Sequence, residues 1–255
     1  MKAYINHHIF TQTSLDSGAL TMLGAIIHNF PEPGIYHGTV FQGPETVARF
    51  QLLVEEDSPA MQADIDLAAL KAPSDCCDCG SEAHDVEQYF SVNPKGYAVF
   101  YVSRGAGGYA VQVAKVPAEG DKEQQKKRAA AAFDSRELKD GDLFAATLIR
   151  PGTYSVTNEN AKATGQIAVA FPKAGKAPFR PGDPVSIECT AAVFRPAKIA
   201  IEASQGQLYR VKVPSRIKIE LLKPDDGPAV SPQPTIASWS KPGRPKSRVG
   251  TRSKS

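Results

Sequence analysis

Residues 31–55 read Pro-Glu-Pro-Gly-Ile-Tyr-His-Gly-Thr-Val-Phe-Gln-Gly-Pro-Glu-Thr-Val-Ala-Arg-Phe-Gln-Leu-Leu-Val-Glu. After a turn signal at residues 31–34, a run of β-branched and aromatic residues extends from Ile35 to Phe41. Gly43-Pro44 opens a second apolar run, from Val47 to Glu55. Short runs of this composition between Gly and Pro turns predict β-strands.

The same pattern continues along most of the chain. In the first half it predicts further strands at Met61–Leu67, Val86–Val92, Tyr97–Ser103 and Tyr109–Val116. In the second half it predicts strands at Leu143–Ile149, Thr153–Asn158, Gln166–Phe171, Val185–Thr190, Lys198–Ala203, Leu208–Val213 and Ile217–Leu222. Because long helical patterns are missing, a parallel α/β sheet is disfavoured. The expected fold class is all-β, with two antiparallel β-sandwich-like domains.

Changes in composition suggest where these domains begin and end. Residues 1–116 form the expected first domain, which contains a cysteine-rich loop at 73–85. Residues 117–141 are rich in charged and amide side chains and then alanine, which predicts a linker with a short helix. The second domain is expected at 142–223, followed by a disordered basic tail at 224–255.

A short internal echo connects the two halves. The segment Pro33-Gly-Ile-Tyr36 resembles Pro151-Gly-Thr-Tyr154, and in each case a Pro-Gly turn leads into a strand through a tyrosine. The echo is compatible with a duplicated unit, but such turns also recur in unrelated β-rich proteins. The sequence leaves both explanations open.

The charge of the chain is unevenly distributed. The formal net charge is +3, yet residues 239–255 contain six Lys or Arg residues and no acid. Removing those six from the 30 basic residues leaves 24 against 27 acidic residues, so a basic surface on the folded body is not implied. We find neither a signal-peptide pattern nor a membrane-length apolar run, and we expect a cytoplasmic protein.

Three of the four cysteines lie in residues 75–84, Asp-Cys-Cys-Asp-Cys-Gly-Ser-Glu-Ala-His. Cys76, Cys79 and His84 have the spacing C-x2-C-x4-H, which resembles the first three ligands of a zinc knuckle, with Tyr89 where that family has its fourth ligand. The resemblance implies a zinc site on Cys76, Cys79 and His84. Such a site needs a fourth donor, for which Cys77, Asp75, Asp78, Asp85 and the distant Cys189 are the candidates. A plain acidic loop and a redox-active pair of cysteines are the alternatives.

A second local resemblance lies near the end of the second half. Val193–Ile201, followed by Gly206 and Leu208–Val213, is similar to the strand pair F-x-P-x-x-I-x-V-x-x-G of cupredoxins. The likeness implies a sandwich architecture. It does not extend to a blue-copper site, because no His follows His84 and no Met follows Met61.

The tail segment Lys241-Pro-Gly-Arg-Pro-Lys246 resembles the core of an AT-hook, with Pro242 in place of the first arginine. The resemblance implies contacts to nucleic acid through Lys241, Arg244, Lys246 and Arg248. The alternative is a tail that only solubilises or tethers the protein.

These patterns contain no nucleophile–base arrangement and no cofactor loop, so we expect no enzyme activity, although the sequence leaves this open. His28 and His37 lie in or near the first strands, where an isolated histidine is typical of a partly buried strand residue. The leading hypothesis is a non-enzymatic binding or assembly protein that acts through β-sandwich surfaces, with a protein partner or self-association. Zinc binding through the cysteine cluster and nucleic-acid association through the tail are the alternatives.

Overall fold

The structure is a computed structural model of the 255-residue chain, and it describes residues 8–70, 88–117, 132–172 and 180–227. The regular secondary structure of the described part consists of strands and one four-residue helix, α1 (His8–Thr11), so the predicted all-β class is confirmed. Within these ranges no helix is both long and apolar enough to cross a membrane. Contacts divide the chain into Met1–Asp225, which contains every strand, and Asp226–Ser255.

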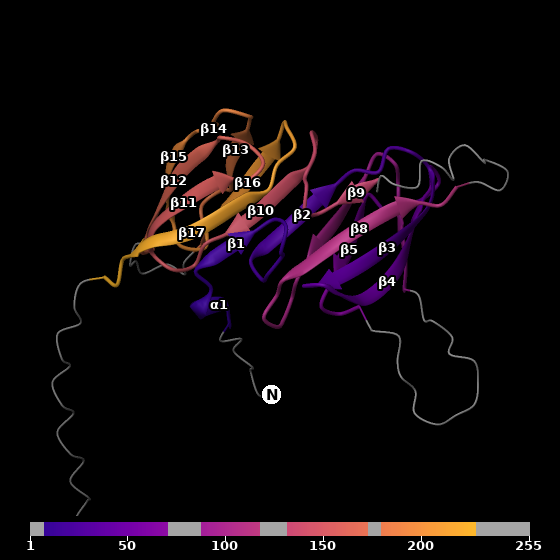
Figure 1. The fold of residues 1–255 in the computed structure, drawn as a ribbon, viewed down its shortest axis with the longest axis horizontal. Coiled ribbons are helices and arrows are strands. Elements are labelled where there is room, and N and C mark those ends of the chain that lie inside the picture. The colour runs from indigo at the N-terminus through magenta and orange to yellow at the C-terminus, as the bar shows by residue number, and fades with distance from the viewer. Residues whose placement is uncertain (1–7, 71–87, 118–131, 173–179, 228–255) are drawn as a thin grey trace, which may run out of the picture. The chain divides into compact units, whose positions relative to one another are not determined.

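A seven-stranded sheet runs through the first unit and takes strands from both halves of the chain (Figure 1). In spatial order its strands are β14 (Phe194–Arg195), β13 (Val185–Cys189), β16 (Gly206–Val211), β10 (Leu143–Thr147), β2 (Gly24–His28), β7 (Tyr97–Tyr101) and β5 (Gln62–Asp66). The antiparallel pair β2–β10 joins the two halves, with Ile26 opposite Phe144.

Two five-stranded sheets accompany it, one for each half. The first has the order β6 (Gln88–Val92), β4 (Glu45–Val54), β3 (Gly34–Gln42), β8 (Tyr109–Lys115) and β9 (Phe133–Asp134). The second has the order β1 (Ser14–Asp16), β17 (Ile217–Pro224), β11 (Gly152–Asn158), β12 (Thr164–Ala170) and β15 (Lys198–Glu202). Alternate side chains of these strands are buried, as in β11, which is the period expected of a strand with one face in the core.

The two halves pair their strands in the same way. Around β2, the neighbour β7 is antiparallel and β5 joins β7 in parallel; around β10, β16 and β13 do the same. In the outer sheets, β3 pairs with β4 and β8 as β11 pairs with β12 and β17, and a parallel edge strand follows in each case. The echo in the sequence therefore marks a repeated topology.

The first strand of each half pairs with a sheet strand of the other half. β1 precedes the first half but pairs with β17 of the second, whereas β9 precedes the second half but pairs with β8 of the first. Figure 1 shows the indigo β1 beside the orange β17. Each exchanged strand leads into an equivalent segment. Asp16-Ser17-Gly-Ala-Leu20 follows from β1 and Asp134-Ser135-Arg-Glu-Leu138 follows from β9, and the two segments lie 118 residues apart.

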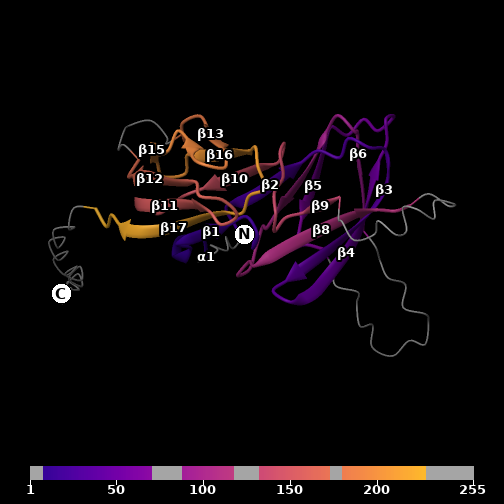
Figure 2. The same ribbon diagram turned by 45° about the horizontal axis from the view of Figure 1, so that its top comes forward.

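Equivalent hydrogen bonds hold both exchanged strands. The Ser17 hydroxyl accepts a 2.9 Å bond from the backbone N–H of Ile217, and the Ser135 hydroxyl accepts a 2.9 Å bond from that of Val111. Both serines are fully buried, where an unpaired polar group would be costly. Each half is thus completed by a strand from the other, as the second view also shows (Figure 2).

The expected antiparallel pairing is wrong in part, because all three sheets are mixed. Parallel partners such as β4 and β6 are separated in sequence by β5, which belongs to another sheet, so local periodicity could not reveal them. The segment that resembles cupredoxins divides between sheets, with β15 beside β12 and β16 between β13 and β10. β9 falls inside 117–141, the predicted linker, whose expected helix lies almost wholly outside the described residues.

Candidate ligand-binding pocket

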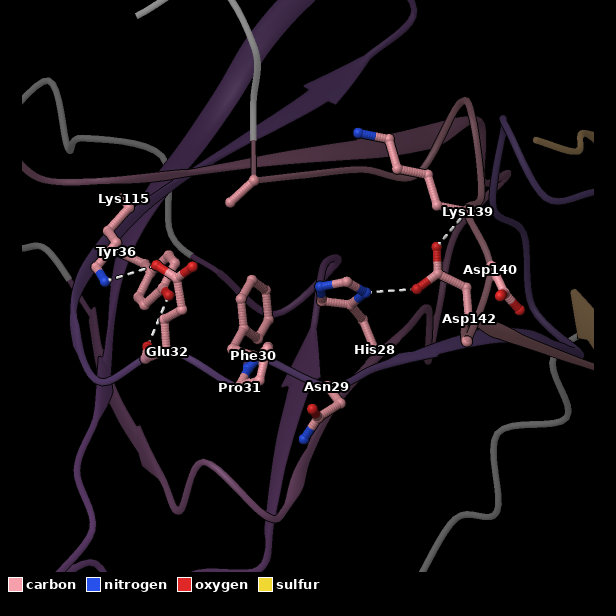
Figure 3. A pocket seen from close by; sticks show the side chains of 12 residues that line it. His28, Asn29, Phe30, Pro31, Glu32, Tyr36, Lys115, Lys139, Asp140 and Asp142 are labelled. Carbon is pink, nitrogen blue, oxygen red and sulfur yellow. Dashed lines mark hydrogen bonds and ion pairs between the residues drawn. The ribbon is translucent and has the colours of Figure 1, made fainter. Parts of the chain in front are cut away.

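A pocket of about 480 Å³ opens where the end of β2 meets the turn between β9 and β10 (Figure 3). Its lining residues come from the β2–β3 connection, the end of β8 and the turn before β10: His28, Asn29, Phe30, Pro31, Glu32, Tyr36, Lys115, Ala132, Lys139, Asp140, Gly141 and Asp142. Both halves of the chain therefore contribute to one cavity, and its volume is in the range of small-molecule sites.

His28 and Asp142 form the polar centre of the pocket. The Nδ1 atom of His28 lies 2.5 Å from the Oδ1 atom of Asp142, and the other carboxylate oxygen accepts a 2.6 Å bond from the backbone N–H of Lys139. The Asp142 side chain is only 3% exposed, whereas that of His28 is 17% exposed. Because a carboxylate only accepts, it fixes the tautomer with hydrogen on Nδ1, and Nε2 is the ring atom left for a ligand.

Two aromatic rings hold the imidazole in place. Phe133, which arrives on the exchanged strand β9, stacks on His28 with ring centroids 4.4 Å apart. Phe30 meets the same ring edge-on, also at 4.4 Å. Figure 3 shows the second ring nitrogen directed away from Asp142, towards the middle of the pocket. The packing and the carboxylate together orient His28 before any ligand arrives.

The opposite end of the pocket contains Glu32, Lys115 and Tyr36. The Lys115 ammonium lies 2.9 Å from a Glu32 carboxylate oxygen and 5.9 Å from the centroid of the Tyr36 ring. The Tyr36 hydroxyl donates a 2.7 Å hydrogen bond to the backbone carbonyl of Glu32. Burial, and then the negative charge of Glu32, raise the pKa of Tyr36 to about 12, so this phenol stays protonated at neutral pH.

Each of the three acidic side chains that line the pocket already has a basic partner. Besides the two pairs described, Asp140 lies 3.6 Å from the ammonium of Lys212 outside the pocket. No ion pair is found for the Lys139 ammonium among the described residues, and its side chain extends over the pocket in Figure 3. Among the charged and titratable side chains of the pocket, the atoms left for a ligand are therefore Nε2 of His28 and Nζ of Lys139.

The equivalent position in the other half is built differently. By the 118-residue relation, His28 corresponds to Ala146 and Asp142 to Gly24, and these two small residues face each other in the β2–β10 ladder. Asp140, whose side chain is 70% exposed, corresponds to Met22, which is 4% exposed and belongs to the core. The pseudo-symmetric frame thus carries the ion pair at one of its two equivalent positions and small or apolar residues at the other.

The residues predicted from sequence lie elsewhere. Cys76, Cys77, Cys79 and His84 are outside the described residues, and so are Lys241, Arg244, Lys246 and Arg248, so both sites stay predictions. Tyr89, at the closing position of the knuckle pattern, is on the edge strand β6 and is 73% exposed. In the described part of the chain, no three His, Cys, Asp or Glu side chains are grouped as metal ligands would be.

Cys189, considered from sequence as a distant metal donor, is fully buried in the second half. Its sulfur lies 3.5 Å from both the Asn158 amide and the Ser215 hydroxyl. Burial raises the pKa of the Cys189 thiol, although these two hydrogen bonds oppose the shift, so the thiol is protonated at neutral pH.

Sequence reasoning noted His28 only as one of several strand histidines and missed Asp142. A usable signal was present, because aligning Pro33-Gly34 with Pro151-Gly152 places His28 against Ala146 and Asp142 against Gly24. Searches against known protein families, curated proteins and solved structures find no match to this chain.

Proposed function

We propose that this protein is a binding protein built on two sandwich-like units, and that the His28–Asp142 pocket holds a small polar molecule. The observation that carries the proposal is the difference between equivalent positions. One position has Gly24 and Ala146 paired in a ladder, and the other has a buried carboxylate and an oriented imidazole beside a cavity of about 480 Å³.

The cost of this arrangement supports a role in binding. Burying the Asp142 carboxylate requires desolvation, which its pairing with His28 and the Lys139 N–H only offsets. At the equivalent position of the other half, small and apolar residues are packed in place of the His28–Asp142 pair, so the fold itself does not need an ion pair there. A buried, oriented polar group at the edge of a cavity is a common feature of ligand sites.

The test is a screen of small polar compounds by saturation-transfer NMR, with hits measured by calorimetry. The informative variant is His28→Ala/Asp142→Gly, which installs the residues of the equivalent position. Tyr89→Ser, on an exposed edge strand, is the matched control. We expect hits that bind wild type and Tyr89→Ser equally and lose at least tenfold affinity in the double variant. Hits that bind all three proteins equally would place the site elsewhere and reject the proposal.

A further inference from the structure

The groups that face the pocket define the chemical class of its ligand. The carboxylates of Glu32, Asp140 and Asp142 each lie within 3.6 Å of a basic nitrogen of Lys115, Lys212 or His28. The Lys139 ammonium and the Nε2 atom of His28 have no such partner among the described residues. A further cation would compete with existing pairs, whereas an anion would complete the two remaining groups.

Resting on the binding function proposed above, we infer that the pocket recognises a small organic anion, held through a carboxylate-type group between Lys139 and the imidazolium of His28. Asp142 keeps its hydrogen bond at Nδ1, so the protonated ring presents Nε2–H as a donor to the anion. The Asp142 charge also compensates the imidazolium when it forms at the edge of the core. Phe30, Pro31 and Tyr36 line the rest of the cavity and suit an apolar or aromatic body.

Protonation of His28 makes the binding pH-dependent. In the neutral ring with hydrogen on Nδ1, Nε2 carries a lone pair that repels an anion, whereas the protonated ring donates Nε2–H to it, so the affinity for an anion falls as the pH rises. The other charged or titratable groups that face the ring or line its pocket are Asp142, Lys139 and Asp140 from the β9–β10 turn, Glu32 and Tyr36 from the β2–β3 side, and Lys115 from β8. Tyr36, with its raised pKa, stays protonated at neutral pH.

Three probes of nearly equal size separate the possibilities: benzoate, benzamide and benzamidinium, which carry one negative charge, no charge and one positive charge. We expect calorimetry on the full chain to show benzoate binding at least tenfold more tightly than benzamide, with benzamidinium weakest. Lys139→Ala should reduce benzoate affinity about tenfold and leave benzamide affinity unchanged. Lys198→Ala, which removes an exposed lysine of β15 that neither lines the pocket nor pairs with a residue that does, is the control for net charge.

The outcomes distinguish this inference from the function on which it rests. If benzamide or benzamidinium binds as tightly as benzoate, and the His28→Ala/Asp142→Gly variant loses that binding, the pocket is a ligand site but the anion class is wrong. If benzoate binds equally to wild type and to that double variant, the pocket itself is rejected. Benzoate affinity that does not change between pH 5.5 and 8.5, or no benzoate binding, also overturns the inference.

Discussion

The first and second halves of the chain share a strand order and differ in what they bury around it. Three structural features are the same in both halves. Gly34 and Gly152 have φ of +145° and +149°. Tyr36 and Tyr154 each donate a 2.7 Å hydrogen bond to the carbonyl four residues before it, and Ser17 and Ser135 each accept a hydrogen bond from a neighbouring strand. A positive φ strains any residue with a Cβ, so the two glycines belong to the shared corner. These positions define the frame.

Each half has an ion pair between an aspartate and an arginine, but the arginine comes from a different part of the chain in each case. Arg136 reaches Asp134 from two residues away, at 2.8 Å, whereas Asp16 receives its arginine, Arg216, from the other half of the chain, also at 2.8 Å. Gly18 stands where Arg136 would be expected, and a Cβ there would lie 2.6 Å from the Arg216 side chain. The same bidentate pair is thus built from different directions in the two halves.

The interiors also differ. In the second half, a buried hydrogen-bonded group is formed by Asn158, Cys189 and Ser215. According to the strand registers, the equivalent positions in the first half are occupied by Val40, Leu67 and Tyr109. These three side chains are buried and form hydrogen bonds with one another, so they belong to the core. The His28–Asp142 pair differs because it borders open space.

The exchanged strands offer the most severe test of the comparison. We expect Phe133→Ala to lower the free energy of unfolding by about 3–5 kcal/mol, since Phe133 is 2% exposed and stacks on Phe100 as well as His28. Leu15→Ala, the equivalent change in β1, should cost about 2–5 kcal/mol. Urea denaturation measures both. A loss below about 1 kcal/mol in either variant would show that the exchanged strand is dispensable.

The ion pair provides a test of intermediate size. His28→Ala alone leaves the buried Asp142 carboxylate without its partner, and we expect a loss of about 3 kcal/mol. His28→Ala/Asp142→Gly reproduces the pairing of Ala146 with Gly24 and should be more stable than the single variant. Denaturation of wild type, both single variants and the double variant gives the coupling energy. A double variant less stable than His28→Ala would mean that the two positions are not structurally equivalent.

The smallest expected effect concerns the two corner tyrosines. Burial raises both pKa values, but the neighbouring charge differs: Glu32 raises the pKa of Tyr36 further, whereas the equivalent Arg150 lowers that of Tyr154. Glu32→Arg should therefore lower the pKa of Tyr36 from about 12, and ultraviolet titration of a Tyr154→Phe background would follow it. A pKa that does not fall would contradict the charge assignment.

The raised pKa of Tyr36 also fixes the sign of its effect on stability. The unfolded chain ionises at the ordinary value of 10.0, below the folded value of about 12. The stabilisation is therefore fully present below pH 10 and is lost as the pH rises towards 12. In Tyr36→Phe this part of the alkaline loss of stability should disappear.

Local sequence was sufficient for the class of fold and for most strands, because alternation and Gly-Pro turns act within a few residues. It could not give the parallel pairs or the exchange of β1 and β9, which depend on partners far away in the chain, such as Ser17 with Ile217. The pocket was missed for the same reason, since His28 and Asp142 are 114 residues apart. The contact between His28 and Asp142 can be inferred only when the two halves of the chain are aligned with each other.

The most direct test of the account is side-chain NMR of His28 in the ligand-free protein and at saturation with the tightest compound from the screen. We predict an Nδ1–H that stays bonded to Asp142 and a large shift at Nε2, with smaller shifts at Lys139. The equivalent position, at Met22, Gly24 and Ala146, should remain unchanged. An unchanged His28 Nε2 together with shifts at that equivalent position would contradict the claim that the binding site lies where the two halves differ.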